Sequence, residues 1–167
     1  MNRTQRRAVQ HKRAMRNPAR WQADPTAAFA LIAHRTPMAG EHAAACSNEV
    51  RLAWHHLCHG SGTTAHFDAV ATAMNICLVR AETIGADAVE VAIRAQGAMV
   101  AMQQRYLRCA RLGPDADALA HVPIALDLYD QLLQLSSPLQ LRNALAESLD
   151  RIAAGHTLAP RQQEHAA

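Results

Sequence analysis

The 167-residue sequence has few aromatic residues, few glycines and prolines, and no long apolar run. Aromatic residues make up only 4% of it, although half of the residues are apolar and alanine is the most frequent of these. Sheets are rich in aromatic and β-branched residues, so this composition favours closely packed helices. No apolar stretch approaches the roughly 18 residues of a membrane span, and a single domain of this length can bury a real core.

Paired cysteines and an export signal are also missing. None of the four cysteines belongs to a CxxC motif: Cys46, Cys58, Cys77 and Cys109. Their even number allows two disulfides, but we expect reduced thiols that act as small core residues. The apolar run Ala27–Ala33, downstream of Arg6 and Arg7, has only seven residues and predicts a helix rather than a signal peptide. We therefore expect a cytoplasmic protein.

Acidic residues are absent from the first 20 positions, which hold seven basic residues: Arg3, Arg6, Arg7, Lys12, Arg13, Arg16 and Arg20. The remaining 147 residues carry ten basic and fourteen acidic side chains, so a charge of +7 is followed by one of −4. Wound as a helix, this segment would have no apolar stripe. We expect residues 1–23 to be a flexible basic arm whose seven cations contact nucleic-acid phosphates. Alternatively, such an arm aids solubility or docks on an acidic body.

Helical spacing and stop signals predict an all-α, single-domain bundle of five to six mostly antiparallel helices over residues 24–155, followed by a frayed tail, 156–167. In "SSPLQ", Ser137 suits an N-cap, Pro138 the first helical position and Gln140 a capping box. Thr63 or Thr64 can cap an earlier helix. The predicted helices span residues 26–34, 40–58, 65–84, 87–112, 115–135 and 138–154.

The predicted helix 87–112 carries two apolar stripes, which is typical of a helix with neighbours on two sides. We therefore expect it to be the most buried element. Gln96 and Gln103 fall within its apolar surface and are predicted to form hydrogen bonds across the bundle. In the helix 115–135, Pro123 predicts either a kink or the true first turn.

The stretch "AWHHLCHGSG", residues 53–62, holds three histidines and a cysteine. On a helical wheel, His55 and His59 lie one turn apart, opposite the face of Cys46, Val50 and Trp54. Zinc needs three or four protein ligands, and a third would have to come from elsewhere, for example His66. We expect no metal and no cofactor here, but a solvated histidine face near a helix C-terminus.

Sequence motifs of common enzymes are missing too. The chain has no HExxH, no phosphate-cradling glycine loop and no GxSxG. A nucleophilic Cys58 beside His55 or His59 would need a third orienting group. Asp127 and Asp130 share a helix face as a carboxylate pair, but a solvated face is the commoner explanation. We therefore expect no enzymatic activity.

Three segments, "MNRTQRR", "NICLVRAE" and "ALDLYDQLLQLSSPLQ", resemble a group of small, functionally uncharacterised all-helical proteins of beta-proteobacteria and their plasmids or integrated elements. Some members are labelled regulators of the Fis type, which implies DNA binding through a C-terminal helix-turn-helix. This sequence departs from that pattern, because residues 138–154 hold only Arg142 and Arg151 against Glu147 and Asp150. The resemblance supplies no catalytic residues.

Two functions remain from the sequence. The first is a non-enzymatic, nucleic-acid-associated accessory protein that uses the basic arm. The second is a helical protein–protein interaction module, as a homodimer or an adaptor, because Leu52 falls on an exposed helix face and the apolar arcs exceed what a small monomer needs.

Overall fold

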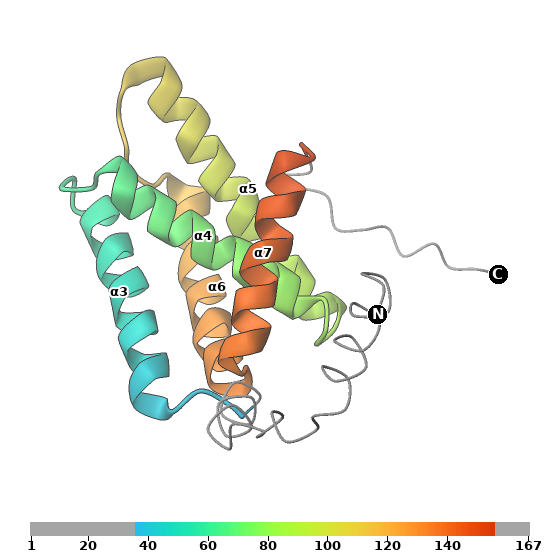
Figure 1. The fold of residues 1–167 in the computed structure, drawn as a ribbon. Helices are drawn as coiled ribbons and strands as arrows, with labels where there is room; N and C mark the ends of the chain where they lie inside the picture. Colours follow the sequence, from blue (N-terminus) through green and yellow to red (C-terminus); the bar gives the residue numbers. More distant parts are fainter. Residues whose placement is uncertain (1–35, 156–167) are drawn as a thin grey trace, which may run out of the picture. The chain divides into compact units, whose positions relative to one another are not determined.

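The computed structural model describes residues 36–155, which belong to one compact unit of the chain (Figure 1). Their regular structure consists of helices without strands, which confirms the all-α prediction. The basic arm, the predicted helix 26–34 and the tail lie outside the described residues. The elements are α3 (Gly40–Cys58), α4 (Thr64–Ala81), α5 (Ala86–Cys109), α6 (Ala116–Leu135) and α7 (Pro138–Ala153).

Side-chain caps begin three of these helices where the sequence places turn residues. The predicted capping box of α7 is confirmed, since Ser137 Oγ accepts a hydrogen bond from Gln140 N and Gln140 Oε1 accepts one from Ser137 N at 2.8 Å. Thr63 caps α4 in the same way, with His66 Nδ1 as the reciprocal acceptor. Asp115 caps α6 through the N–H of Ala118 at 2.9 Å.

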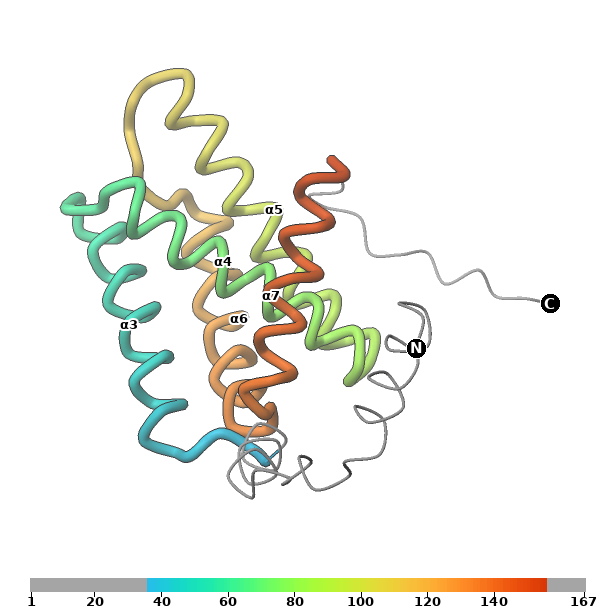
Figure 2. The backbone as a smooth tube through the Cα atoms, viewed as in Figure 1, coloured from blue at the N-terminus to red at the C-terminus, as the bar shows by residue number. Residues whose placement is uncertain are grey.

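Helix α4 is the centre of the bundle, which corrects the prediction for α5. It packs against each of the other four described helices, whereas α5 packs mainly against α4 and α6 (Figures 1 and 2). The predicted core face of α4 is buried throughout: Phe67, Val70, Met74, Cys77, Leu78 and Ala81. The apolar arc of α5 misled the prediction because a wide arc does not show how many neighbours a helix has.

One stripe of α5 is buried and the other is not. Alanines and methionines such as Ala95 and Met102 point into the core, while Ile93 is half-buried and Leu107 is 77% exposed. Gln96 is buried and donates to Asn75 Oδ1 of α4 at 2.7 Å, as predicted for a hydrogen bond across the bundle. Gln103 is exposed, so the same prediction was wrong for it.

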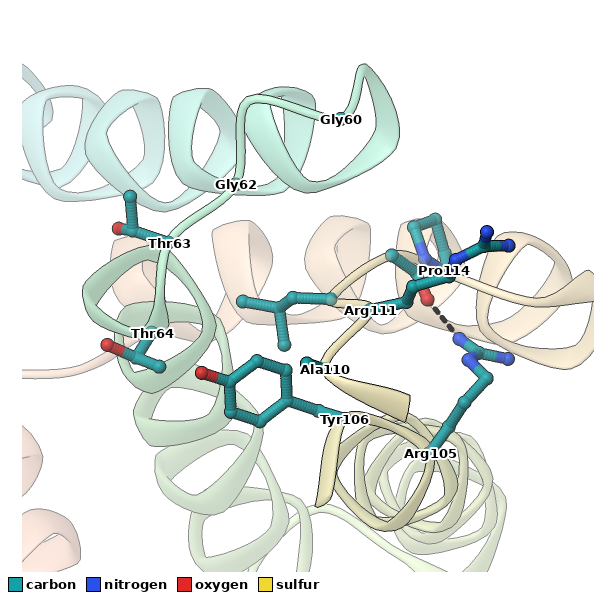
Figure 3. A pocket seen from close by; sticks show the side chains of 11 residues that line it. Gly60, Gly62, Thr63, Thr64, Arg105, Tyr106, Ala110, Arg111 and Pro114 are labelled. Atoms are coloured by element: carbon teal, nitrogen blue, oxygen red, sulfur yellow. Dashed lines mark hydrogen bonds between the residues drawn. The ribbon is translucent and has the colours of Figure 1, made fainter. Parts of the chain in front are cut away.

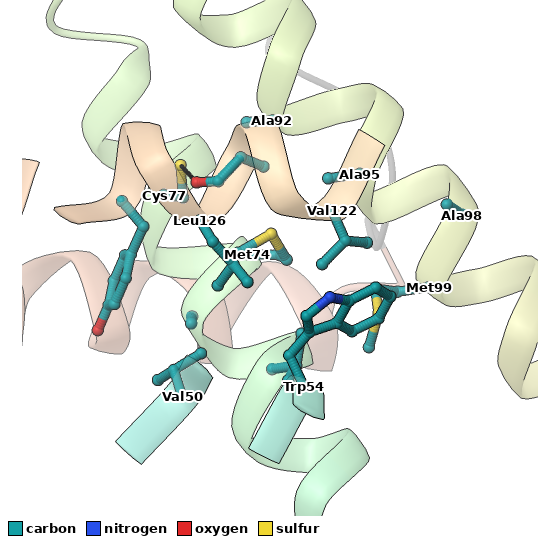
Figure 4. Packing of buried hydrophobic residues seen from close by; sticks show 14 of the residues in the cluster. Val50, Trp54, Met74, Cys77, Ala92, Ala95, Ala98, Met99, Val122 and Leu126 are labelled. Atoms are coloured by element: carbon teal, nitrogen blue, oxygen red, sulfur yellow. Dashed lines mark hydrogen bonds between the residues drawn. The ribbon is translucent and has the colours of Figure 1, made fainter. Parts of the chain in front are cut away.

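The core is built around small side chains that let the helices approach closely (Figure 4). Alanine is its most frequent residue, and Trp54 packs beside Met99 and Val122. Cys77 is buried, and burial raises the pKa of its thiol to about 12. Cys46 and Cys109 are exposed instead, so the expected core role of the cysteines holds in full for Cys77 alone.

The ends of two helices differ from the sequence prediction, and the first of these, α4, ends at Ala81 rather than at residue 84. Helix α5 ends at Cys109 rather than near Leu112, because Ala110 adopts a left-handed conformation with φ 54° and its N–H bonds to the carbonyl of Tyr106. Pro123 lies inside α6 and does not mark its first turn. None of the described helices has the length and apolar character needed to cross a membrane.

Candidate functional site

The seven predicted phosphate-contacting residues, from Arg3 to Arg20, lie outside the described part of the chain. Residues 36–155 carry eight arginines, no lysine and twelve acidic residues, a net charge of −4 with neutral histidines. The helical body is therefore acidic, opposite in charge to the basic arm.

Five of these eight arginines are held by other groups of the bundle. Arg151 donates two hydrogen bonds to Glu82, at 2.7 and 2.8 Å, and one to Glu147 at 3.0 Å, which confirms the predicted pair on α7. These bonds, those to Glu82 first, raise the pKa of Arg151. A recognition helix presents free cations to DNA, whereas the engagement of Arg151 leaves α7 with Arg142 alone. Three arginines make no such contact with any described residue: Arg108, Arg111 and Arg142.

Asp127 and Asp130 of α6 do not form an open carboxylate pair. The Nη2 atom of Arg51, on α3, lies 2.6 Å from Asp127 Oδ1 and 2.5 Å from Asp130 Oδ2. These hydrogen bonds raise the pKa of Arg51. The second oxygen of Asp130 is buried without a hydrogen-bond partner in the described structure, and Asp130 is one of the residues that line a cavity of about 280 Å³. The three side chains thus tie α3 to α6.

The histidines at the corner of α3 and α4 stack in two pairs rather than converging. The ring centroids of His55 and His59 lie 3.9 Å apart, and those of His56 and His66 4.6 Å apart at an interplanar angle of 8°. Nearly parallel rings direct their nitrogen lone pairs along similar lines, whereas metal ligands must point at one atom. Across the described residues, no group of three or more metal-ligating side chains is placed to hold an ion.

The ring nitrogens of these histidines form hydrogen bonds with the nearby backbone and with the α3–α4 loop. His59 Nδ1 donates to the carbonyl of His55 at 2.8 Å, and His56 Nδ1 lies 2.9 Å from Ser61 Oγ. Neither bond involves Cys58, whose pKa is raised by burial, away from a reactive thiolate. The cluster therefore closes the end of α3 and begins α4.

A cavity of about 650 Å³ lies beside this corner, between the α3–α4 loop and the α5–α6 loop (Figure 3). Thr63 and Thr64 form one side, and Tyr106, from the last turns of α5, points its ring and hydroxyl toward them. Arg105 and Arg111 line the side of the α5–α6 loop. None of the lining residues in the described chain is acidic.

Close packing on Leu57 brings the two loops together. A Cβ on Gly62 would lie 2.6 Å from Leu57 Cδ2 and 2.9 Å from its Cα, so this position needs glycine. The other loop passes the same residue less closely, since a Cβ on Gly113 would lie 3.9 Å from the carbonyl oxygen of Leu57. Arg105 fixes that loop by donating to the Gly113 carbonyl and to Asp115 Oδ2, the latter at 3.0 Å.

Sequence reasoning did not identify this cavity. The sequence offered Thr63 or Thr64 as a helix cap and a break between the predicted helices 87–112 and 115–135, and neither signal predicts a cavity. Nothing in the sequence shows that loops about 50 residues apart adjoin. Comparison with known proteins adds no further candidate: no family model, curated protein or solved structure matches the chain.

Proposed function

We propose that the protein is a non-enzymatic, nucleic-acid-associated accessory protein that contacts phosphates through its basic arm. The observation that carries this proposal is the separation of charge along the chain. All seven cations of the first 20 residues lack an acidic neighbour in sequence, whereas the helical body has a charge of −4 and engages most of its arginines internally. Arginine suits phosphate because its planar guanidinium can donate two parallel hydrogen bonds.

Phosphate contacts carry no base information, so the arm should bind unrelated sequences about equally. If about six of its cations contact duplex DNA, the logarithm of the affinity falls with the logarithm of the salt concentration at a slope of roughly −5. The acidic body repels the same phosphates, which leaves the arm as the element that supplies affinity.

The test compares three proteins: the intact chain, the chain without residues 1–23, and a full-length arm-neutral variant with glutamine at the seven basic positions. Binding to unrelated DNA duplexes and to RNA is measured across a salt series. We expect both altered proteins to lose most of the affinity and of the salt slope, with unchanged helicity and melting temperature. A full-length Arg94→Gln variant, altered at an exposed arginine paired with Glu90 on α5, serves as the control. Absence of binding by the intact chain at low salt would contradict the proposal.

A second candidate is a helical interaction module, favoured by large apolar side chains on the surface of the bundle. Among the described residues, eight large apolar side chains are between 44% and 77% exposed: Leu52, Ile84, Leu107, Leu119, Ile124, Leu135, Leu149 and Ile152. Light scattering after gel filtration tests this candidate, since a homodimer requires a mass near twice the 18.2 kDa of the chain.

A further inference from the structure

We propose that the cavity between the α3–α4 and α5–α6 loops binds one nucleotide unit, with the base on the ring of Tyr106 and the phosphate at Arg111. This inference deepens the proposed function, since it names a ligand class for a second site on the helical body. The same chemistry is offered by a free nucleotide and by an unpaired residue of a nucleic-acid strand, and the experiment distinguishes these sources.

The size and lining of the cavity suit such a ligand. Its volume of about 650 Å³ is in the range of small-molecule sites, which are roughly 300 to 1,000 Å³. The ring of Tyr106 borders the cavity, and aromatic rings stack on any base because every base has a π-face. Thr63 and Thr64 border the cavity on the opposite side, where the Thr63 hydroxyl already caps α4 through the N–H of His66.

Charge favours an anionic ligand at the α5–α6 loop. Arg105 is engaged by Asp115 and by the Gly113 carbonyl, so it holds the loop in place. Arg111, next along the same side, makes no hydrogen bond or ion pair with the described residues and is exposed. An unpaired guanidinium in a cavity without acidic lining attracts phosphate in a helical body that is otherwise acidic.

Contacts of the bundle hold the two loops that border the cavity, so its backbone is preformed, while its lining side chains are half-buried or exposed. Gly62 lies close against Leu57, and the Arg105 bonds link the end of α5 to the start of α6. A preformed site lowers the ordering cost of binding.

The test uses full-length variants and three probes: AMP, a fluorescent ten-residue thymidine oligonucleotide, and inorganic phosphate. Tyr106→Leu removes the ring and Arg111→Gln removes the cation. Tyr106→Phe keeps the ring, and Arg108→Gln removes an unpaired, exposed arginine of the last turn of α5 that does not line the cavity. We expect Tyr106→Leu and Arg111→Gln each to weaken binding of AMP or the oligonucleotide about ten-fold, as for the loss of one stacked base or one charge-assisted contact. The two control variants should bind as the unaltered protein does.

Competition identifies the source of the nucleotide. AMP that displaces the oligonucleotide assigns the cavity to an unpaired strand residue, and AMP binding without oligonucleotide binding assigns it to a free nucleotide. Three results overturn the inference: neither probe binds, Arg108→Gln weakens binding as much as Arg111→Gln, or inorganic phosphate competes as well as AMP. Arg111→Gln alters an exposed loop residue and keeps the test valid if Tyr106→Leu impairs folding.

The arm-neutral variant separates this inference from the proposed function. If it loses duplex binding yet binds AMP with unchanged affinity, both proposals are supported. If it keeps its duplex binding and Arg111→Gln still weakens AMP binding, the arm proposal fails and the cavity proposal stands.

Discussion

Single polar residues at the helix ends connect neighbouring elements of this bundle, and Asp115 makes two such interactions. Its Oδ1 atom accepts from the N–H of Ala118 and caps α6, while Oδ2 lies 3.0 Å from Nη1 of Arg105 on α5. The Ala118 hydrogen bond, and then the charge of Arg105, hold the pKa of this carboxyl below its ordinary value. One side chain thereby joins a cap to an inter-helix ion pair beside the cavity.

We expect the stability of the bundle to depend on pH through Asp115. Its folded pKa lies below the unfolded one of about 3.9, so its contribution is complete above pH 4 and is lost as the pH falls through the folded pKa. Asp115→Asn keeps a capping oxygen but loses the charge. At pH 7 this variant should be less stable by about 0.5–1 kcal/mol, since the ion pair is part-exposed. The difference should shrink in urea unfolding as the pH falls through the folded pKa of Asp115. A difference that is constant with pH would contradict the assignment.

At the scale of elements, the loops are more tightly specified than their composition suggests. Gly62 follows α3 and approaches the backbone of Leu57, whereas Gly97 lies in the middle of α5 with nothing within 4 Å of an added Cβ. The first glycine is required by packing. Gly97 weakens the helix that contains it, and no close packing requires a glycine there.

Matched glycine substitutions should therefore have opposite signs. Gly62→Ala places a methyl group against backbone and should destabilise the fold by about 1–3 kcal/mol. Gly97→Ala gains helix propensity in open space and should stabilise it by about 0.5–1 kcal/mol. Urea unfolding midpoints at equal slope measure both changes. Equal stability of Gly62→Ala and the unaltered protein would show that the α3–α4 loop moves away from Leu57 at little cost.

For the whole helical body, stability is distributed unevenly around α4. That helix contacts four others, whereas α7 packs mainly against α4 and has only Ala144 and Ser148 fully buried. The ion pair of Arg151 with Glu82, at the end of α4, holds α7 at a part-exposed interface, and the pair with Glu147 lies within α7 itself. Ion pairs of this kind contribute less than apolar burial does.

We expect amide hydrogen exchange to follow this difference. The middle of α4, around Met74 and Cys77, should exchange only with global unfolding, and α7 should open at a lower free energy. Exchange followed by mass spectrometry at several urea concentrations measures both. Protection of α7 equal to that of α4 would contradict this order and would point to a neighbour of α7 beyond the described residues.

Local signals account for what the sequence by itself determined. Helical periodicity and caps such as Ser137 with Gln140 act within about four residues, so the helices of the described chain were predicted closely, as was the pair of Glu147 and Arg151. The charge difference between the basic arm and the body is likewise a property of the sequence alone.

Only the tertiary structure decided which helix is central and what lies beside what. The choice of α4 over α5 depends on neighbours distant in sequence, and the Arg51 pairs with Asp127 and Asp130 join residues more than 75 positions apart. The cavity is lined by residues of two separate loops, which the bundle brings together near Leu57. Helix formation depends on nearby residues and can be recognised within a short segment of sequence. A site depends on how complete helices pack against one another, and the residues of a single segment do not show which other segments it will contact.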